Sequence, residues 1–180
     1  MSKAKRQATR PRVVLRDFSK SLPMALMRTR EAVMKRFRPS LRDHDITEQQ
    51  WRVLRALEHA GPLEATELAR RTMLLAPSLS RILRDLEARG LVERASVRSD
   101  LRRARIRVSA VGARLIAAIA PDSEATYDSI TRQFGHDKLN ALFALLNELE
   151  QALETEAPLA GGDQRPRADS RSMRRDARKE

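Results

Sequence analysis

Apolar residues recur at helical spacing over most of the chain between residues 20 and 155. Thr47 is placed to cap the second helix of this pattern, and Gly61-Pro62 should end that helix. We expect Pro39 to end or bend the first helix and Pro121 to kink the fifth. The helices are expected over residues 20–41, 47–60, 64–71, 76–89, 110–133 and 136–155. The chain is therefore predicted to be mainly α.

The pattern changes between the fourth and fifth helices. Residues 91–94 and 106–108 alternate apolar and polar positions, which is typical of strands. A polar, arginine-rich stretch from Ser96 to Ala104 separates them, and we expect it to be the loop of a β-hairpin. Two short helices joined by a turn and followed by a hairpin predict a winged helix-turn-helix, with the hairpin as the wing.

The charge is concentrated where this unit lies. The chain of 180 residues has a formal net charge of +12 at pH 7. Residues 66–109 hold eleven arginines and five acidic residues, whereas residues 110–156 hold three basic and eight acidic residues. A basic segment that coincides with a helix-turn-helix and wing favours double-stranded DNA as the partner. The near absence of aromatic residues, at 3%, argues against stacking on single-stranded RNA.

Composition also excludes several classes of function. The sequence contains no cysteine, so disulfides, thiolate metal sites and cysteine nucleophiles are excluded. Its three histidines lack metal-ligand spacing, and no glycine-rich phosphate loop or G-x-S-x-G motif is present. We expect no enzyme activity, no catalytic or metal site and no cofactor. No apolar stretch is long enough to span a membrane, and a cytoplasmic location is expected.

The fourth helix and the wing carry the candidate DNA contacts. Pro77 should open this helix, with Ala76 or Ser78 near the cap. Arginine can grip a guanine or a phosphate with two hydrogen bonds, although an arginine on a helix can also simply be solvated. The candidate residues are Ser78, Ser80, Arg81 and Arg84 on the helix, and Arg98, Asp100, Arg102 and Arg103 in the wing.

The second helix carries an unusual combination. Glu48, Trp51 and Arg55 share one face of that helix. An arginine beside a tryptophan on a buried face needs a partner for its charge. That partner can be Glu48, or it can be the carboxylate of a small aromatic ligand that packs against the tryptophan ring.

Several of these segments resemble the MarR family of transcriptional regulators. The similar residues are Leu86-Glu87-Ala88-Arg89-Gly90-Leu91-Val92, Ser99-Asp100-Leu101-Arg102-Arg103 and Val108-Ser109-Ala110-Val111-Gly112, where Ser109 replaces the usual threonine. Within the family, the chain is most similar to the regulators of homoprotocatechuate and hydroxyphenylacetate degradation. The residues that carry this similarity are Arg30-Glu31-Ala32, Phe37-Arg38-Pro39, Thr47-Glu48-Gln49-Gln50-Trp51-Arg52 and Pro77-Ser78-Leu79.

The resemblance implies a homodimer that binds a pseudo-palindromic operator and is released by a small aromatic acid. Such an acid would be hydroxyphenylacetate-like or hydroxynicotinate-like, and the genes controlled would serve aromatic catabolism. Pro23 departs from the family pattern, because it stands where a relative has a polar contact with the ligand. The ligand residues that the resemblance implies are Ser21, Glu48, Trp51, Arg55 and Tyr127.

These expectations divide the chain into five parts. They are a basic disordered arm (1–17), an N-terminal dimerisation helix (18–45), a winged helix-turn-helix DNA-binding domain (46–109), C-terminal dimerisation helices (110–156) and a disordered charged tail (157–180). The apolar stripe of the last helix suits dimer packing but could also belong to an intramolecular core. An alternative function is an architectural or constitutive DNA-binding protein without a small-molecule effector.

Overall fold

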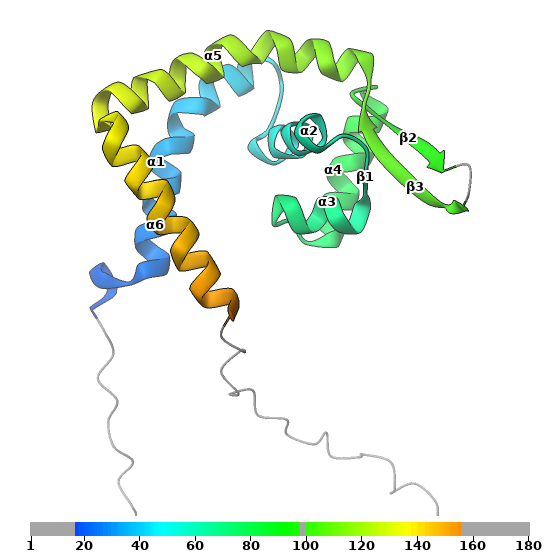
Figure 1. Cartoon of the computed structure of the whole chain (residues 1–180). Coiled ribbons are helices and arrows are strands. Elements are labelled where there is room, and N and C mark those ends of the chain that lie inside the picture. The colour runs from blue at the N-terminus through cyan, green and yellow to red at the C-terminus, as the bar shows by residue number, and fades with distance from the viewer. Residues whose placement is uncertain (1–16, 98–99, 156–180) are drawn as a thin grey trace, which may run out of the picture. The chain divides into compact units, whose positions relative to one another are not determined.

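The computed structural model describes residues 17–97 and 100–155, and it confirms a mainly helical fold with a small antiparallel sheet (Figure 1). All six predicted helices are present, with ends within two residues of the expected ones. The elements in chain order are η1 (Phe18–Lys20), α1 (Leu22–Asp43), α2 (Glu48–Ala60), β1 (Leu63–Glu64), α3 (Ala65–Thr72), α4 (Ala76–Ala88), β2 (Val92–Val97), β3 (Asp100–Val108), α5 (Ala110–Phe134) and α6 (His136–Thr155).

The chain forms two compact units, Met1–Gln133 and Phe134–Glu180, and α6 is the described helix of the second. No helix in the described ranges is long and apolar enough to cross a bilayer. The core of the first unit draws on α1 to α5, β2 and β3. Its buried apolar side chains are Phe37, Leu41, Ile46, Val53, Leu54, Leu57, Leu68, Leu79, Leu83, Leu86, Leu91, Val92, Ile106, Ile116 and Ile119.

The N-terminus of α2 has the cap that the sequence predicted. The Thr47 hydroxyl accepts a hydrogen bond from the backbone N–H of Gln50 at 3.2 Å. The Gln50 side-chain oxygen accepts one from the backbone N–H of Thr47 at 2.8 Å, which completes a capping box. At the other end, Gly61 adopts a φ of 74° and ends the helix as expected.

Of the two outcomes expected at Pro39, an end or a bend, the end does not occur, because the helix continues through Pro39 to Asp43. A proline inside a helix costs about 3 kcal/mol, through one lost hydrogen bond and a steric clash. Leu41 lies just beyond it and is buried in the core, which contributes about 1.5–3 kcal/mol. Tertiary packing of the last turn therefore offsets the proline. α5 also continues through Pro121, and the kink expected there stays a prediction.

Pro77 opens α4 with Ala76 next to the cap, as the sequence predicted. The N-cap residue itself is Leu75. Because the fixed φ of Pro77 suits the second position of a helix, Ala76 becomes the first helical residue and Ser78 falls inside the first turn.

The sheet is larger than the sequence predicted. Its strand order is β1-β3-β2, and both pairings are antiparallel. β1 has only two residues, which is too short to give an alternating pattern, and its Leu63 pairs with Ile106 at the centre of the sheet. The loop expected over residues 96–104 is wrong, because β2 reaches Val97 and β3 begins at Asp100. Strands pair through backbone groups, so a polar sequence does not prevent pairing.

α1 and α5 lie side by side and are joined by polar contacts. The Arg36 guanidinium donates to the Gln133 side chain at 2.7 Å, and the Ser40 hydroxyl donates to Asp122 at 2.8 Å. The rings of Phe37 and Tyr127 meet edge to face with centroids 5.0 Å apart. These contacts fix which face of α5 is turned toward α1.

A tight junction connects the start of α5 to the base of the sheet. The Ser109 hydroxyl donates to the carbonyl of Gly90 at 2.6 Å and accepts from the backbone N–H of Gly112 at 3.0 Å. A Cβ atom at Gly112 would collide with the carbonyl oxygen of Leu91 and lie 2.9 Å from Val108. The junction therefore requires glycine at position 112.

We predict that Gly112→Ala destabilises the protein by about 1–3 kcal/mol, because the added methyl overpacks the junction. Helix propensity alone predicts the opposite sign, a gain of about 1 kcal/mol. Urea unfolding followed by circular dichroism measures the change. The control is Ala113→Ser, at the exposed neighbouring position. A stabilised Gly112→Ala variant would contradict the prediction, because it would show that the backbone at Leu91 shifts to accommodate the added methyl group.

Candidate functional site

α3 and α4 form a helix-turn-helix through the turn Met73-Leu74-Leu75. Leu74 packs against the core and anchors the turn. Met73 has left-handed backbone angles, φ 52° and ψ 38°, and Leu75 has no side-chain hydrogen bond to cap α4. The left-handed conformation costs a non-glycine residue about 1–2 kcal/mol, and a missing cap costs about 1 kcal/mol. Both side chains are largely exposed, at 83% for Met73 and 78% for Leu75.

α4 buries one side and presents the predicted contact residues on the others. Leu79, Leu83 and Leu86 are buried, as the spacing predicted. The four candidate DNA contacts on this helix are all exposed: Ser78, Ser80, Arg81 and Arg84.

Arg81 and Arg84 differ from the other arginines of this region. Within the described ranges, neither forms a salt bridge, and Arg84 makes only a weak 3.4 Å hydrogen bond to the Ser80 carbonyl. By contrast, Glu67 accepts hydrogen bonds from the two arginines at the end of α3, which lower its pKa to about 2. Arg94 pairs in the same way with Glu87. The arginines on the exposed faces of α4 thus keep their charge available for an external anion.

A hollow of about 410 Å³ lies between the start of α2 and α4. Ser78 and Arg81 line it from α4. Gln50 is buried at its edge and donates to the Asp85 carboxylate, which ties α2 to α4. This bond helps to hold the exposed face of α4 in place.

The candidates of the wing are placed only in part. Arg98 lies outside the described residues. Asp100, Arg102 and Arg103 belong to β3, where Asp100 pairs with Val97. These three are therefore strand residues and not the loop residues that the sequence predicted.

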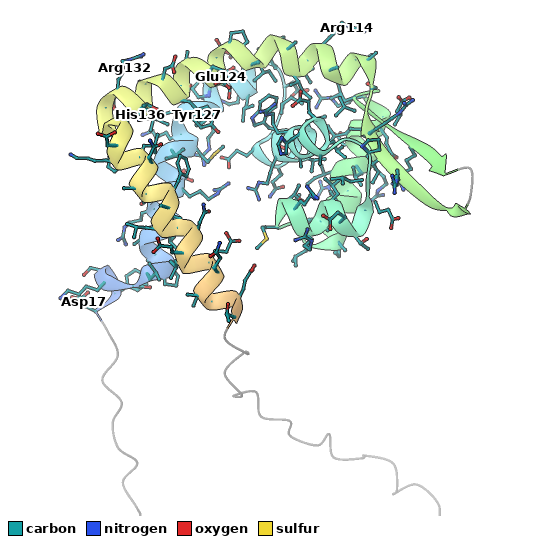
Figure 2. All side chains as sticks on the ribbon, viewed as in Figure 1. Asp17, Arg114, Glu124, Tyr127, Arg132 and His136 are labelled. Carbon is teal, nitrogen blue, oxygen red and sulfur yellow. The ribbon has the colours of Figure 1, made fainter. Side chains whose placement is uncertain are left out.

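A pocket of about 390 Å³ lies between α1, α2 and α5. It brings together four of the five predicted ligand residues: Glu48, Trp51, Arg55 and Tyr127. Tyr127 comes from α5 (Figure 2). Four further residues line the pocket that the sequence did not predict: Arg30, Met34, Arg52 and Ser123. Arg52 lies on α2 four residues after Glu48, so helical spacing could have indicated it. No local pattern marks the other three, because α1 and α5 reach the pocket only through tertiary packing.

The fifth predicted residue, Ser21, does not line this pocket. It is the N-cap of α1. At 1.5 Å per residue, it lies about 14 Å along the helix axis from Arg30, the first pocket residue on that helix. A single chain therefore does not bring Ser21 to the other four.

The pairing of Arg55 with Glu48, one of the two alternatives weighed above, is not formed. Arg55 instead donates to Glu58 at 2.7 Å, three residues further along α2. Its guanidinium carbon lies 5.8 Å from the centroid of the Trp51 ring, within reach of a cation–π attraction. The Arg55–Glu58 pair is about half exposed on both sides, so its net contribution is small and Arg55 can exchange partners readily.

Glu48 is already neutralised by two arginines of α1. It accepts hydrogen bonds from Arg30 at 2.7 Å and from Arg38 at 2.5 Å. Partial burial acts to raise the pKa of the Glu48 carboxyl, but the hydrogen bonds from Arg38 and Arg30 outweigh it and hold the pKa below its usual value. Arg38 also pairs with Glu31. The carboxylate of Glu48 is thus ionised, and its two oxygens are already bonded to Arg30 and Arg38.

The remaining lining gives the pocket a positive and aromatic character. Three arginines and a single carboxylate line it, so the net charge of the lining is positive. Trp51 and Met34 are half-buried against the core and form apolar walls. Edge-on contact with Phe37 holds the Tyr127 ring at the side of the pocket. A flat apolar body with one carboxylate is the kind of molecule that this lining suits.

Comparison with known proteins agrees with this geometry. Residues 44–103 match the family model described as MarR family. The chain is 39% identical over 129 residues to the HTH-type transcriptional regulator FarR of Neisseria gonorrhoeae, which covers 72% of this chain and 88% of FarR. It is 38% identical over 128 residues to the homoprotocatechuate degradative operon repressor of Escherichia coli, which covers 71% of this chain and 86% of the repressor.

Among solved structures, the fold matches NadR in complex with 4-hydroxyphenylacetate. The TM-score is 0.67 at 37% identity, and the match covers 76% of this chain and 97% of NadR. These relatives are regulators and not enzymes. The helix-turn-helix, the paired hairpin behind it and the extent of the matches lead to one assignment: the chain belongs to the MarR family of transcriptional regulators.

Proposed function

We propose that this regulator represses transcription as a homodimer on a double-stranded operator and that a small aromatic carboxylic acid releases it. The observation that carries the proposal is the pocket, which Arg30, Arg52, Arg55 and Trp51 line and in which Glu48 is already paired. The proposal includes control of genes for the breakdown of such acids.

The surface of α4 supports the DNA-binding part of the proposal. The N-terminal part of a recognition helix contacts base edges in the major groove. Here that part presents Ser78, Ser80 and Arg81, followed one turn later by Arg84. Because no described carboxylate pairs with either arginine, binding a phosphate or guanine breaks no salt bridge. We assign the wing residues Arg98, Asp100, Arg102 and Arg103 to the same surface, because repeated arginines in the hairpin favour a DNA groove.

The apolar residues of α6 support the homodimer. No residue of α6 is buried within the described part of the single chain. Phe143, Leu145 and Leu153 are each more than half exposed. Large apolar surfaces of this kind are normally covered by a partner. We therefore assign α1, α5 and α6 to dimerisation, and a two-fold dimer must place its two α4 helices about 34 Å apart to meet a palindromic site.

The charge balance of the pocket supports an anionic effector. The carboxylate of a ligand can replace Glu58 as the partner of the Arg55 guanidinium, because the Arg55–Glu58 pair is exposed. The aromatic ring of the ligand can then pack on Trp51. Tyr127 then offers a phenolic hydroxyl to a polar substituent of the ring. Ser21 can join this site only from the α1 helix of the second copy. Because NadR, which is 37% identical to this chain, was solved in complex with 4-hydroxyphenylacetate, acids of this kind are the first candidates for the effector.

Release follows from the position of the pocket between α2 of the DNA-binding unit and the helices α1 and α5. A ligand there favours one spacing of the two DNA-binding units over another. By linkage, it can weaken operator binding only by the ratio of its affinities for the two spacings. The alternative, a constitutive regulator, requires that the pocket binds no acid at all.

The homodimer is tested by Leu145→Asp. In a dimer the new charge would be buried against the partner, and we expect association at least about 100-fold weaker. Sedimentation equilibrium at micromolar concentrations measures it. Asn147→Asp adds the same charge at another exposed position of α6 and should change association little. A monomeric wild-type chain, or equal weakening by both variants, would contradict the assignment of α6.

The DNA surface is tested by Arg81→Ala. A duplex selected by the protein from a random-sequence pool is compared with a scrambled duplex at one salt concentration, by fluorescence anisotropy. Loss of a bidentate base contact should weaken binding to the selected duplex about 10- to 100-fold and to the scrambled one far less. Arg132→Ala, at an exposed position of α5 (Figure 2), should leave both affinities unchanged. Equal losses on both duplexes would make Arg81 a phosphate contact only.

The effector site is tested by calorimetric titration with 4-hydroxyphenylacetate, homoprotocatechuate, salicylate and 6-hydroxynicotinate. We expect one of them to bind, and Arg55→Ala to weaken that binding about 10- to 150-fold through loss of a charged hydrogen bond. Arg132→Ala should bind it normally. The same acid should lower the affinity for the selected duplex. Binding by no acid would support the constitutive alternative, and binding unaffected by Arg55→Ala would place the carboxylate elsewhere.

A further inference from the structure

Met73 and Leu75 form an exposed apolar tip on the helix-turn-helix. They flank Leu74, whose side chain packs against the core and fixes the turn between them. Met73 and Leu75 are among the most exposed large apolar residues of the described chain. A single exposed apolar side chain needs no explanation. Two adjacent ones, Met73 and Leu75, at the tip of the helix-turn-helix form a distinct apolar surface.

Both positions oppose the local preference of the backbone. The left-handed conformation of Met73 is one that glycine or asparagine adopts more readily. The N-cap position of Leu75 favours serine, threonine, aspartate or asparagine. Neither side chain gains burial within the described chain in return. Departures from local preference without a compensating contact are expected at functional positions.

The neighbouring charges indicate what covers this tip. Arg81 and Arg84 follow on the same helix without a carboxylate partner in the described chain. A surface that combines unpaired arginines with an apolar tip at the start of a recognition helix suits the floor of the major groove. In that groove, the apolar group of a base edge is the C5-methyl of thymine.

We infer that Leu75, with Met73 beside it, contacts the C5-methyl groups of thymines in the operator and so contributes to its sequence specificity. The inference rests on the proposed DNA binding. Leu75 and Arg81 are six residues apart, which is about 9 Å along the helix axis. The thymine should therefore lie within about three base pairs of the base that Arg81 contacts, at 3.4 Å per pair.

The test removes single methyl groups from the DNA. Each thymine of the selected duplex is replaced in turn by deoxyuridine, which lacks only the C5-methyl. At one or two positions in each half-site, wild-type affinity should fall about fourfold, the value of one buried methyl group. Leu75→Ala should bind the thymine and deoxyuridine duplexes equally at those positions.

Two further variants separate this role from a structural one. Leu75→Ser supplies the missing cap, so its melting temperature should rise while its sensitivity to the methyl group disappears. Val111→Ala shortens an exposed apolar residue at the start of α5 and should keep the wild-type sensitivity. A merely structural role for Leu75 would not link a gain in stability to a loss of methyl recognition.

The outcomes are distinguishable. If no duplex is selected from the pool, the proposed DNA binding fails. If a duplex is selected but no deoxyuridine substitution matters, or if Leu75→Ala retains the wild-type sensitivity, the inference about Leu75 is wrong while DNA binding stands. If Leu75→Ala instead changes the sedimentation behaviour without DNA, the tip is a contact between copies, and the inference is overturned.

Discussion

The ion pairs of Glu48 with Arg30 and Arg38 hold the arrangement on which the pocket depends. They join the first turn of α2 to the middle of α1, and thus the DNA-binding unit to the helix beside it. They also neutralise the carboxylate in the lining, so that Arg52 and Arg55 determine its charge. Removing both arginines would leave the partly buried Glu48 carboxylate without a partner for its charge, which costs stability. The pairing therefore serves the shape and the electrostatics of the site together.

The same region shows how one fold can combine rigidity with exchangeable contacts. The capping box at Thr47 and the hydrogen bond from Gln50 to Asp85 fix α2 relative to α4. The junction at Ser109 fixes the start of α5 against the base of the sheet. The Arg55–Glu58 pair is exposed and contributes little. In the proposed function, a ligand would replace this weak pair while the elements that carry α4 keep their geometry, and its effect would act through α1 and α5.

The two departures from local preference, Met73 and Leu75, lie in the turn before α4. The glycine that close packing requires, Gly112, lies near the start of α5. Met73 and Leu75 lose backbone stability without burial, whereas Gly112 gives up helix propensity for close packing. The first pattern is expected where a surface is kept for a partner, and the second where two elements must approach closely. The two cases differ in burial: Met73 and Leu75 stay exposed, whereas Gly112 is closely packed against Leu91 and Val108.

The sequence by itself determined the order of the six helices and of the two hairpin strands, because helical periodicity, Thr47, Gly61 and the alternating strands act locally. It did not indicate the two-residue strand β1. It also placed Glu48, Trp51 and Arg55 on one face. Only the tertiary structure decided that Glu48 pairs with Arg30 and Arg38 of α1, that Arg30 and Ser123 join the pocket, that Ser21 does not, and that α1 continues past Pro39. Those outcomes depend on which distant helix packs against each residue. A side chain's partner is set by that packing, and no local pattern encodes it.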